Sequence, residues 1–168
     1  AAGIVQDVEP GGILALANYP TFAPESYNEA PADARRNRSL TDPLETGSVA
    51  KLFTAALLLD SNLVTPNTLF DCEGGRWVVG RRAVKDSHEL GIVPFTEVMR
   101  HSSNIGIIKA AEALDNESWY AGLRRFGLGQ RAGIDLPGEG SGLLYPPDRW
   151  TRLSRSSLPM GYEMALTS

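Results

Sequence analysis

The chain has 168 residues, 42% of them apolar, which is enough to build the core of one folded domain. Its formal net charge is −4 and no basic run is longer than a pair such as Arg81-Arg82, which argues against a nucleic-acid-binding surface and a polybasic membrane patch. Cys72 is the single cysteine, so an internal disulfide is excluded and a buried apolar role is expected. The longest apolar stretch, residues 52–59, is interrupted by Thr54 and is far shorter than the roughly 20 residues that span a bilayer.

Two short apolar segments begin the chain. Residues 3–7 and 13–18 flank Glu9-Pro10-Gly11-Gly12, a composition that favours a turn, so they predict an antiparallel hairpin. Residues 19–46 contain several prolines among polar residues and are expected to run irregularly over the surface. The chain opens directly on a strand-like segment and stops inside an apolar pattern, so we expect both ends to be cut from a longer protein.

The middle of the chain alternates helical and strand-like segments. Residues 48–60 are apolar nearly all round, as in a helix buried at the centre of a domain. Residues 71–86 combine glycines with β-favouring residues and predict a minor hairpin. A short helix from about Pro94 should end near His101, because Ser102-Ser103-Asn104 are residues that prefer caps and turns.

Two more helices are predicted after that turn. Residues 105–114 and 117–126 show helical spacing, and Gly127 is well placed as the left-handed cap of the second helix. Residues 129–147 are rich in glycine and proline and predict a loop with short strands. No internal repeat is visible.

Ser48 and Lys51 are candidates for nucleophilic catalysis. A serine hydroxyl needs a base to remove its proton, and residues at i and i+3 of a helix lie on one face within hydrogen-bonding reach. Lys51 can be that base only if its pKa falls toward neutrality, and both burial in an apolar helix and the positive field of the helix N-terminus favour this. The competing interpretation is a helix-capping serine followed by a lysine that snorkels to solvent.

The spacing alone is weak support for catalysis. A chain of this length yields about 0.7 Ser-x-x-Lys matches by chance. The position of Lys51 adds weight, because lysine is scarce here and this one begins the most apolar helix. Ser-x-Asn occurs twice, at Ser26-Tyr27-Asn28 and at Ser102-Ser103-Asn104, and the second lies on a turn where a hydroxyl and an amide can assist proton transfer or simply cap a helix.

Several segments in collinear order carry a family resemblance. Residues 36–51, which end in Ser48-Val49-Ala50-Lys51, resemble the approach to the nucleophile in class B penicillin-binding proteins, particularly those that build the division septum. His101-Ser102-Ser103-Asn104-Ile105-Gly106 resembles their second motif. Further matches are Gly11-Gly12-Ile13-Leu14-Ala15-Leu16-Ala17, Phe126-Gly127-Leu128-Gly129 and Gly161-Tyr162-Glu163. The resemblance therefore covers essentially the whole chain.

The resemblance implies a role for each candidate residue in a serine D,D-transpeptidase. Ser48 would be acylated by the D-Ala-D-Ala end of a peptidoglycan stem peptide or by a β-lactam, with Lys51 as the base. Ser102 would relay protons toward the leaving amine, and Asn104 would orient Lys51 and the substrate amide. The Ser48 N–H would form half of an oxyanion hole. No cofactor and no metal are implied.

The resemblance also implies a fold, partners and a location. The expected fold is α+β: a helical subdomain bearing Ser48 and Asn104 beside an antiparallel sheet, of which the first hairpin is the part present. Divisome proteins would be partners of the parent protein, and nucleic acid would not. The parent protein would act in the periplasm or on the outer face of the bacterial cytoplasmic membrane, with its anchor outside residues 1–168.

The chain departs from the family pattern at two places. Thr46 stands before Gly47, where the family usually has proline, and we expect the loop to tolerate it. The third family motif, Lys-Thr/Ser-Gly on a sheet strand, is absent from this sequence. That strand normally supplies the other oxyanion N–H and a cation for the substrate carboxylate. Residues 1–168 are therefore expected to be a partial transpeptidase domain, inactive alone.

Other functions remain open at this level. A serine β-lactamase would need an additional base for deacylation, and the candidates Glu112 and Asn116 fall within what reads as continuous helix. A D,D-carboxypeptidase would differ in accepting water in place of an amine. A β-lactam sensor that acylates without turnover, a non-catalytic divisome scaffold, and an unrelated helical domain with chance motifs are the remaining alternatives.

Overall fold

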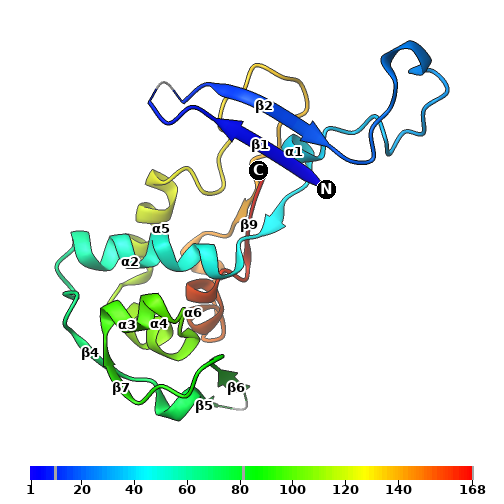
Figure 1. Ribbon diagram of the computed structural model, residues 1–168. Helices are drawn as coiled ribbons and strands as arrows, with labels where there is room; N and C mark the ends of the chain where they lie inside the picture. The colour runs from blue at the N-terminus through cyan, green and yellow to red at the C-terminus, as the bar shows by residue number, and fades with distance from the viewer. Residues whose placement is uncertain (10, 81, 168) are drawn as a thin grey trace.

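A computed structural model describes residues 1–9, 11–80 and 82–167. Helix α2 (Ala50–Asp60) crosses the middle of the molecule in Figure 1, with α3 (Phe95–Arg100) and α4 (Asn104–Ala111) drawn below it. The hairpin of β1 (Ala2–Gln6) and β2 (Ile13–Asn18) is drawn above it. The combination of packed helices and antiparallel strands confirms the predicted α+β class.

The core forms around α2. This helix contacts α4, α5 (Asn116–Arg125) and the short helix η5 (Leu158–Met160), and α6 (Ser154–Ser157) joins the same group through α4 and η5. The largest apolar side chains that are almost fully buried in this core are Leu58, Phe95, Ile107, Trp119, Leu123, Leu128, Leu158 and Met164. Because α2 is covered from several directions, its apolar pattern has to extend nearly all round. No helix among the described residues is long and apolar enough to cross a membrane.

Four small antiparallel sheets lie around the helices in the described part of the chain. Besides β1–β2, β4 (Leu69–Asp71) pairs with β7 (Ile92–Pro94), and β5 (Arg76–Val79) pairs with β6 (Arg82–Lys85). The fourth sheet has the order β3-β9-β8, made by the segments Leu44–Glu45, Met164–Leu166 and Leu143–Leu144. In this sheet β9 pairs with β3, which lies about 120 residues earlier in the chain.

The remaining regular structure consists of short turns of helix. The segment 19–46 is largely irregular, as predicted, but contains η1 (Pro24–Ser26) and the four-residue helix α1 (Arg38–Thr41). Three more 3₁₀ turns are η2 (Gly47–Val49), η3 (Glu73–Gly75) and η4 (Pro147–Arg149).

Most predicted elements are confirmed, with shifted ends. Both predicted hairpins form, while Pro10, Arg81 and Ser168 lie outside the described residues. The helix predicted over 94–101 is α3, and Gly127 has the expected positive φ of 88° after α5. The helix predicted over 105–114 instead runs from Asn104 to Ala111, because the backbone then tightens into turns before α5.

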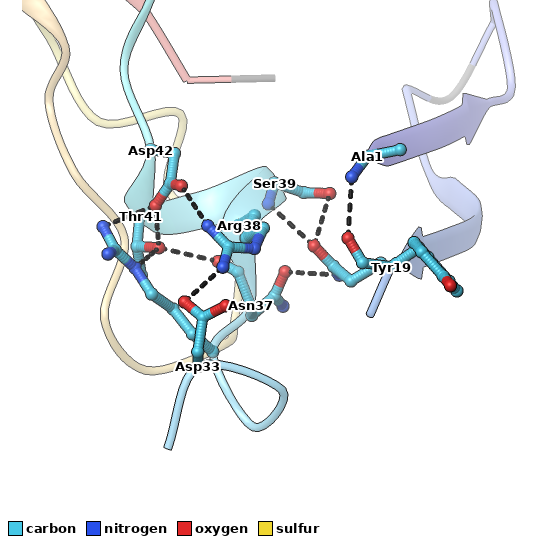
Figure 2. Close-up of polar contacts among 10 residues, drawn as sticks. Ala1, Tyr19, Asp33, Asn37, Arg38, Ser39, Thr41 and Asp42 are labelled. Atoms are coloured by element: carbon cyan, nitrogen blue, oxygen red, sulfur yellow. Dashed lines mark hydrogen bonds and ion pairs between the residues drawn. The ribbon is translucent and has the colours of Figure 1, made fainter. Parts of the chain in front are cut away.

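A polar network fastens the segment before Ser48 to the first hairpin (Figure 2). Asn18, at the end of β2, accepts a hydrogen bond from the Ser39 N–H at 3.1 Å and donates to the Asn37 side chain at 2.9 Å. Arg38 on α1 bridges the carboxylates of Asp33 and Asp42. These contacts hold α1 against the hairpin and set the direction in which the chain enters β3 and η2.

Candidate active site

Ser48 lies on η2, immediately before α2, and is exposed. The helix predicted to begin at Ser48 therefore begins at Ala50, and a 3₁₀ turn carries the serine. The backbone N–H of Gly47 and the hydroxyl of Thr46 both donate to the Gly161 carbonyl, each at 3.3 Å. The φ of Thr46 is −72°, a value that proline also adopts, so the backbone there suits either residue. The loop bearing Ser48 is thus attached to the segment that precedes β9.

Lys51, three residues on, is buried, with 2% of its surface exposed. Its Nζ donates to the Ser102 carbonyl at 2.5 Å, to Ser102 Oγ at 2.9 Å and to Asn104 Oδ1 at 2.8 Å. An ammonium has three N–H donors, so all three are used. Among the hydrogen bonds of the described residues, none joins Lys51 to Ser48. Lys51 lies in the first turn of α2 and Ser48 on the 3₁₀ turn before it, and tertiary contacts decide which groups bind the amine.

Burial is the main influence on the protonation of Lys51. It lowers the pKa from 10.5 to about 8, because a charged amine loses its hydration inside the protein. The negative charge of Asp86 acts in the opposite direction and raises the pKa. The predicted depression by burial is therefore present. A pKa near 8 lets this amine exchange protons close to physiological pH.

The Ser102-Ser103-Asn104 turn connects α3 to α4. Ser102 is exposed and has a φ of +52°, which directs its carbonyl and its hydroxyl to the same Lys51 amine. Asn104 Nδ2 donates to the Lys85 carbonyl at 2.9 Å while its Oδ1 accepts from Lys51, so both ends of the amide are used. The structure thus brings together three of the four predicted site residues through direct hydrogen bonds, with Ser48 on the 3₁₀ turn that precedes the helix of Lys51.

Asp86 is a residue of this site that sequence reasoning missed. It follows β6, and its carboxylate accepts hydrogen bonds from Ser103 Oγ at 2.5 Å and from the backbone N–H groups of Asn104 at 2.6 Å and Ile105 at 3.1 Å. Ser103 Oγ also accepts from the Gly106 N–H at 2.9 Å and so acts as the N-cap of α4. In the sequence, Asp86 is an acidic residue eighteen positions before the start of α4, and no local sequence pattern links residues that far apart.

The weaker candidates lie elsewhere. Ser26 belongs to η1 on the exposed segment before α1, and its hydroxyl contacts the Ala23 carbonyl at 3.3 Å. Glu112 and Asn116 do not lie in a continuous helix, as the sequence suggested, because α4 ends at Ala111 and α5 begins at Asn116. They are nevertheless at the opposite end of α4 from Asn104, and the Asn116 side chain accepts from Arg155 at 3.0 Å.

Two features of the surroundings bear on the chemistry. Cys72 is fully buried in the core, and burial raises the pKa of its thiol, in agreement with the expected apolar role. Within the described residues, no group of three His, Cys, Asp or Glu side chains is arranged to hold a metal ion. The site thus offers a buried amine with a pKa of about 8, the exposed hydroxyl and the amide that bind it, and the exposed hydroxyl of Ser48 three residues before it in the sequence.

The model of the penicillin-binding protein transpeptidase domain matches residues 1–168. The chain belongs to this family. The transpeptidase domain is 38% identical over 169 residues to the penicillin-binding protein PbpB of Mycolicibacterium smegmatis, covering 99% of the chain and 26% of that relative. It is 31% identical to the peptidoglycan D,D-transpeptidase FtsI of Escherichia coli K12, covering 99% of the chain and 28% of that protein.

Solved structures give the same family and fold. Penicillin-binding protein 3 of Mycobacterium tuberculosis, complexed with ampicillin, superposes with a TM-score of 0.87 at 35% identity and covers 99% of the chain and 37% of that structure. A peptidoglycan glycosyltransferase from Burkholderia ambifaria superposes with a TM-score of 0.85 at 36% identity and covers 99% of the chain and 48% of that structure. The chain spans about a quarter of the length of the first of these curated relatives.

Proposed function

We propose that this chain carries the nucleophile half of a serine D,D-transpeptidase that cross-links peptidoglycan stem peptides. The observation that carries the proposal is the Lys51 amine, which is buried, has a pKa of about 8 and is held by Ser102 and Asn104, three residues after the exposed Ser48. The names of the relatives, which include peptidoglycan D,D-transpeptidases, support the reaction class.

The proposed reaction has two acyl-transfer steps. Ser48 Oγ attacks the carbonyl carbon between the two D-alanines, and its proton passes to neutral Lys51. When the C–N bond of the tetrahedral intermediate breaks, the proton returns through Ser102 to the departing amine of D-alanine. An amine of a second stem peptide then attacks the Ser48 ester, forms the new amide and releases the serine hydroxyl. With a β-lactam, the ring C–N bond opens, the nitrogen takes the proton, and the ester persists.

Proton transfer of this kind is compatible with the contacts of Lys51. The Ser102 carbonyl and Asn104 Oδ1 are acceptors only, so they occupy two N–H groups whether Lys51 is charged or neutral. Ser102 Oγ can accept or donate, and it is the partner across which a proton can be exchanged. This supports a relay role for Ser102, with Asn104 as the group that orients the amine.

The chain supplies part of the machinery that this reaction needs. The Ser48 N–H would be one oxyanion donor. Because the sequence contains no Lys-Thr-Gly and matches only 26% of the length of PbpB, we infer that residues 1–168 form a partial domain. The second oxyanion donor and the cation for the substrate carboxylate would then come from another part of a longer protein. That protein would be anchored to the bacterial cytoplasmic membrane, act on its outer face and meet divisome proteins there.

Covalent labelling of the full-length protein tests the proposal. A labelled penicillin should form a covalent adduct with the wild-type protein, and Ser48→Ala should abolish it because the acylated oxygen is gone. Ser26→Ala is the matched control, since Ser26 belongs to the other Ser-x-Asn sequence and lies on an exposed turn, and it should label like wild type. An adduct that survives in Ser48→Ala would contradict the assignment. Product analysis with an added acceptor amine then separates transfer to an amine from hydrolysis.

A further inference from the structure

The N-terminus of α4 is held by a carboxylate from a different element. Asp86 lies directly after β6, and its two oxygens receive hydrogen bonds from one hydroxyl and two backbone N–H groups of residues 103–105. N-terminal N–H groups of a helix have no partners within the helix, and an anion there also interacts favourably with the helix dipole. Asp86 therefore fixes the orientation of the first turn of α4.

That first turn is also part of the candidate active site. Asn104, whose N–H donates to Asp86, presents Oδ1 to Lys51, and its Nδ2 donates to the carbonyl of Lys85, the residue next to Asp86. Ser103, whose hydroxyl donates to Asp86, is the residue that follows Ser102. The backbone and the side chain of Asn104 are thus both attached to the end of β6.

The end of β6 is itself well supported. Strand β6 pairs with β5, and Val84 is buried against Ile105 and Ile108 of α4. The Asp86 N–H donates to the Gly75 carbonyl at 3.0 Å, which fixes the backbone at Asp86. Because its backbone is held in this way, Asp86 can fix the residues that it binds to within a fraction of an ångström, and proton transfer requires such precision.

Asp86 also acts on Lys51 through its charge. The negative charge of Asp86 opposes the effect of burial and raises the pKa of Lys51. Among the elements that pack against α2, η2 and η5 carry no charged side chain, and Lys109 on α4 is paired with Glu73. On α5, Arg125 is paired with Asp60 at the far end of α2, and Glu117 lies in the first turn of α5. Arg124 donates to the backbone carbonyls of Leu128 and Gly129.

We propose that Asp86 is a positioning residue for acylation, which acts through Ser103 and Asn104 to hold the acceptors of Lys51 in place. The inference rests on the proposed function, because it concerns the efficiency of the same acyl transfer. Asp86 does not touch the reacting atoms. Its two contributions, geometry and charge, can be separated by substitution.

Asparagine and alanine at position 86 separate these contributions. Asp86→Asn keeps the shape and one oxygen that accepts from the N–H groups of Asn104 and Ile105, and Ser103 Oγ can accept from the new amide. It removes the charge and reverses the hydrogen bond to Ser103, while the contacts to the two N–H groups stay. Asp86→Ala removes the charge and all three contacts. Asp71→Asn is the matched control, because Asp71 also ends a strand and its carboxylate accepts a hydrogen bond from the Glu73 N–H at 2.8 Å, with no contact to the turn at 102–104.

The measurement is the rate constant of Ser48 acylation by a labelled penicillin from pH 6 to 9.5 in the full-length protein, with the folded fraction followed by circular dichroism. We expect Asp86→Ala to acylate about tenfold more slowly per folded molecule. A factor of this size corresponds to the loss of one helix-capping interaction of ordinary strength at the site. We expect Asp86→Asn to keep the rate at high pH and to shift the midpoint of the profile toward lower pH. Asp71→Asn should match wild type.

The possible failures are distinguishable. If the wild-type protein forms no adduct at any pH, the proposed function is wrong. If the wild-type protein labels and both Asp86 variants keep its rate constant and its midpoint, the positioning role of Asp86 is wrong, even where their stability falls. If Asp86→Ala does not fold, Asp86→Glu decides, because it keeps the charge and displaces the carboxylate by one methylene: a lower rate constant at high pH supports the inference, and the wild-type rate constant overturns it.

Discussion

Lys51 shows how one side chain responds to its surroundings. Its amine is almost fully buried, and burial lowers the pKa to about 8 although the negative charge of Asp86 acts in the opposite direction. Since the pKa in the folded protein is below the ordinary value of 10.5, the unfolded chain binds this proton more tightly. The contribution of Lys51 to stability therefore increases as the pH rises from about 8 to 10.5.

The same pKa predicts the pH dependence of acylation. Neutral Lys51 is the proposed base, so the acylation rate constant should rise with pH through a midpoint near 8 and then level off. Labelling at short times across pH 6 to 9.5 measures the profile. A variant that carries glutamine at both His88 and His101 serves as control, because it removes the two imidazoles of this chain and should leave the midpoint unchanged. A midpoint that disappears in this variant would assign the ionisation to histidine.

At the level of elements, the loop that carries Ser48 depends on a glycine 113 positions later in the chain. Gly161 has a φ of +85°, and a Cβ on this residue would stand 2.0 Å from the Gly47 carbonyl oxygen. The close approach lets the Gly161 carbonyl accept hydrogen bonds from Gly47 and Thr46. The segment that leads into β9 thereby fixes the position of η2.

Gly161→Ala is expected to displace the Ser48 loop. The methyl group overlaps the Gly47 backbone, so labelling by penicillin should slow by about tenfold or more, with a loss of stability of about 1–3 kcal/mol. Gly127→Ala is the control, because Gly127 has a similar φ of 88° and no atom within 4 Å of the added Cβ. It should lose stability through backbone strain and label at the wild-type rate. Equal slowing in both variants would argue against the specific role of Gly161.

At the level of the whole molecule, one core supports the site. Helix α2 lies among α4, α5 and η5, and the same helix carries Lys51 in its first turn. The core is closely packed: a Cβ on Gly122 of α5 would be 2.4 Å from Leu57 Cδ2. Because Lys51 is fixed to α2 and its acceptors are attached to α4, the packing between these two helices determines the geometry around the amine.

Leu58→Ala tests this core. Leu58 is fully buried on α2, and its truncation should reduce the free energy of unfolding by about 2–5 kcal/mol through the cavity that it leaves. Leu52→Ala is the matched control on the same helix, since Leu52 is 62% exposed, and it should change stability by less than about 0.5 kcal/mol. Urea denaturation measures both. Similar losses in the two variants would contradict the described packing of α2.

The sequence by itself determined the features that depend on neighbouring residues. The buried helix after Ser48, the two hairpins, the cap at Gly127 and the turn at 102–104 follow from periodicity, glycine placement and capping preferences, all of which act within a few residues. The ordered motifs were also sufficient to indicate the family.

Only the tertiary structure decided which groups surround the proposed nucleophile and base. Three features join residues that lie from 18 to more than a hundred positions apart in the sequence. They are the sheet β3-β9-β8, the contact between Gly47 and Gly161, and the hydrogen bond from the Asn104 N–H to the carboxylate of Asp86. Sequence patterns describe local backbone preference, whereas these contacts form because burial of one apolar core brings distant segments together. The same burial lowers the pKa of Lys51, so the chemistry proposed for Ser48 depends on the folded core as well as on the motif.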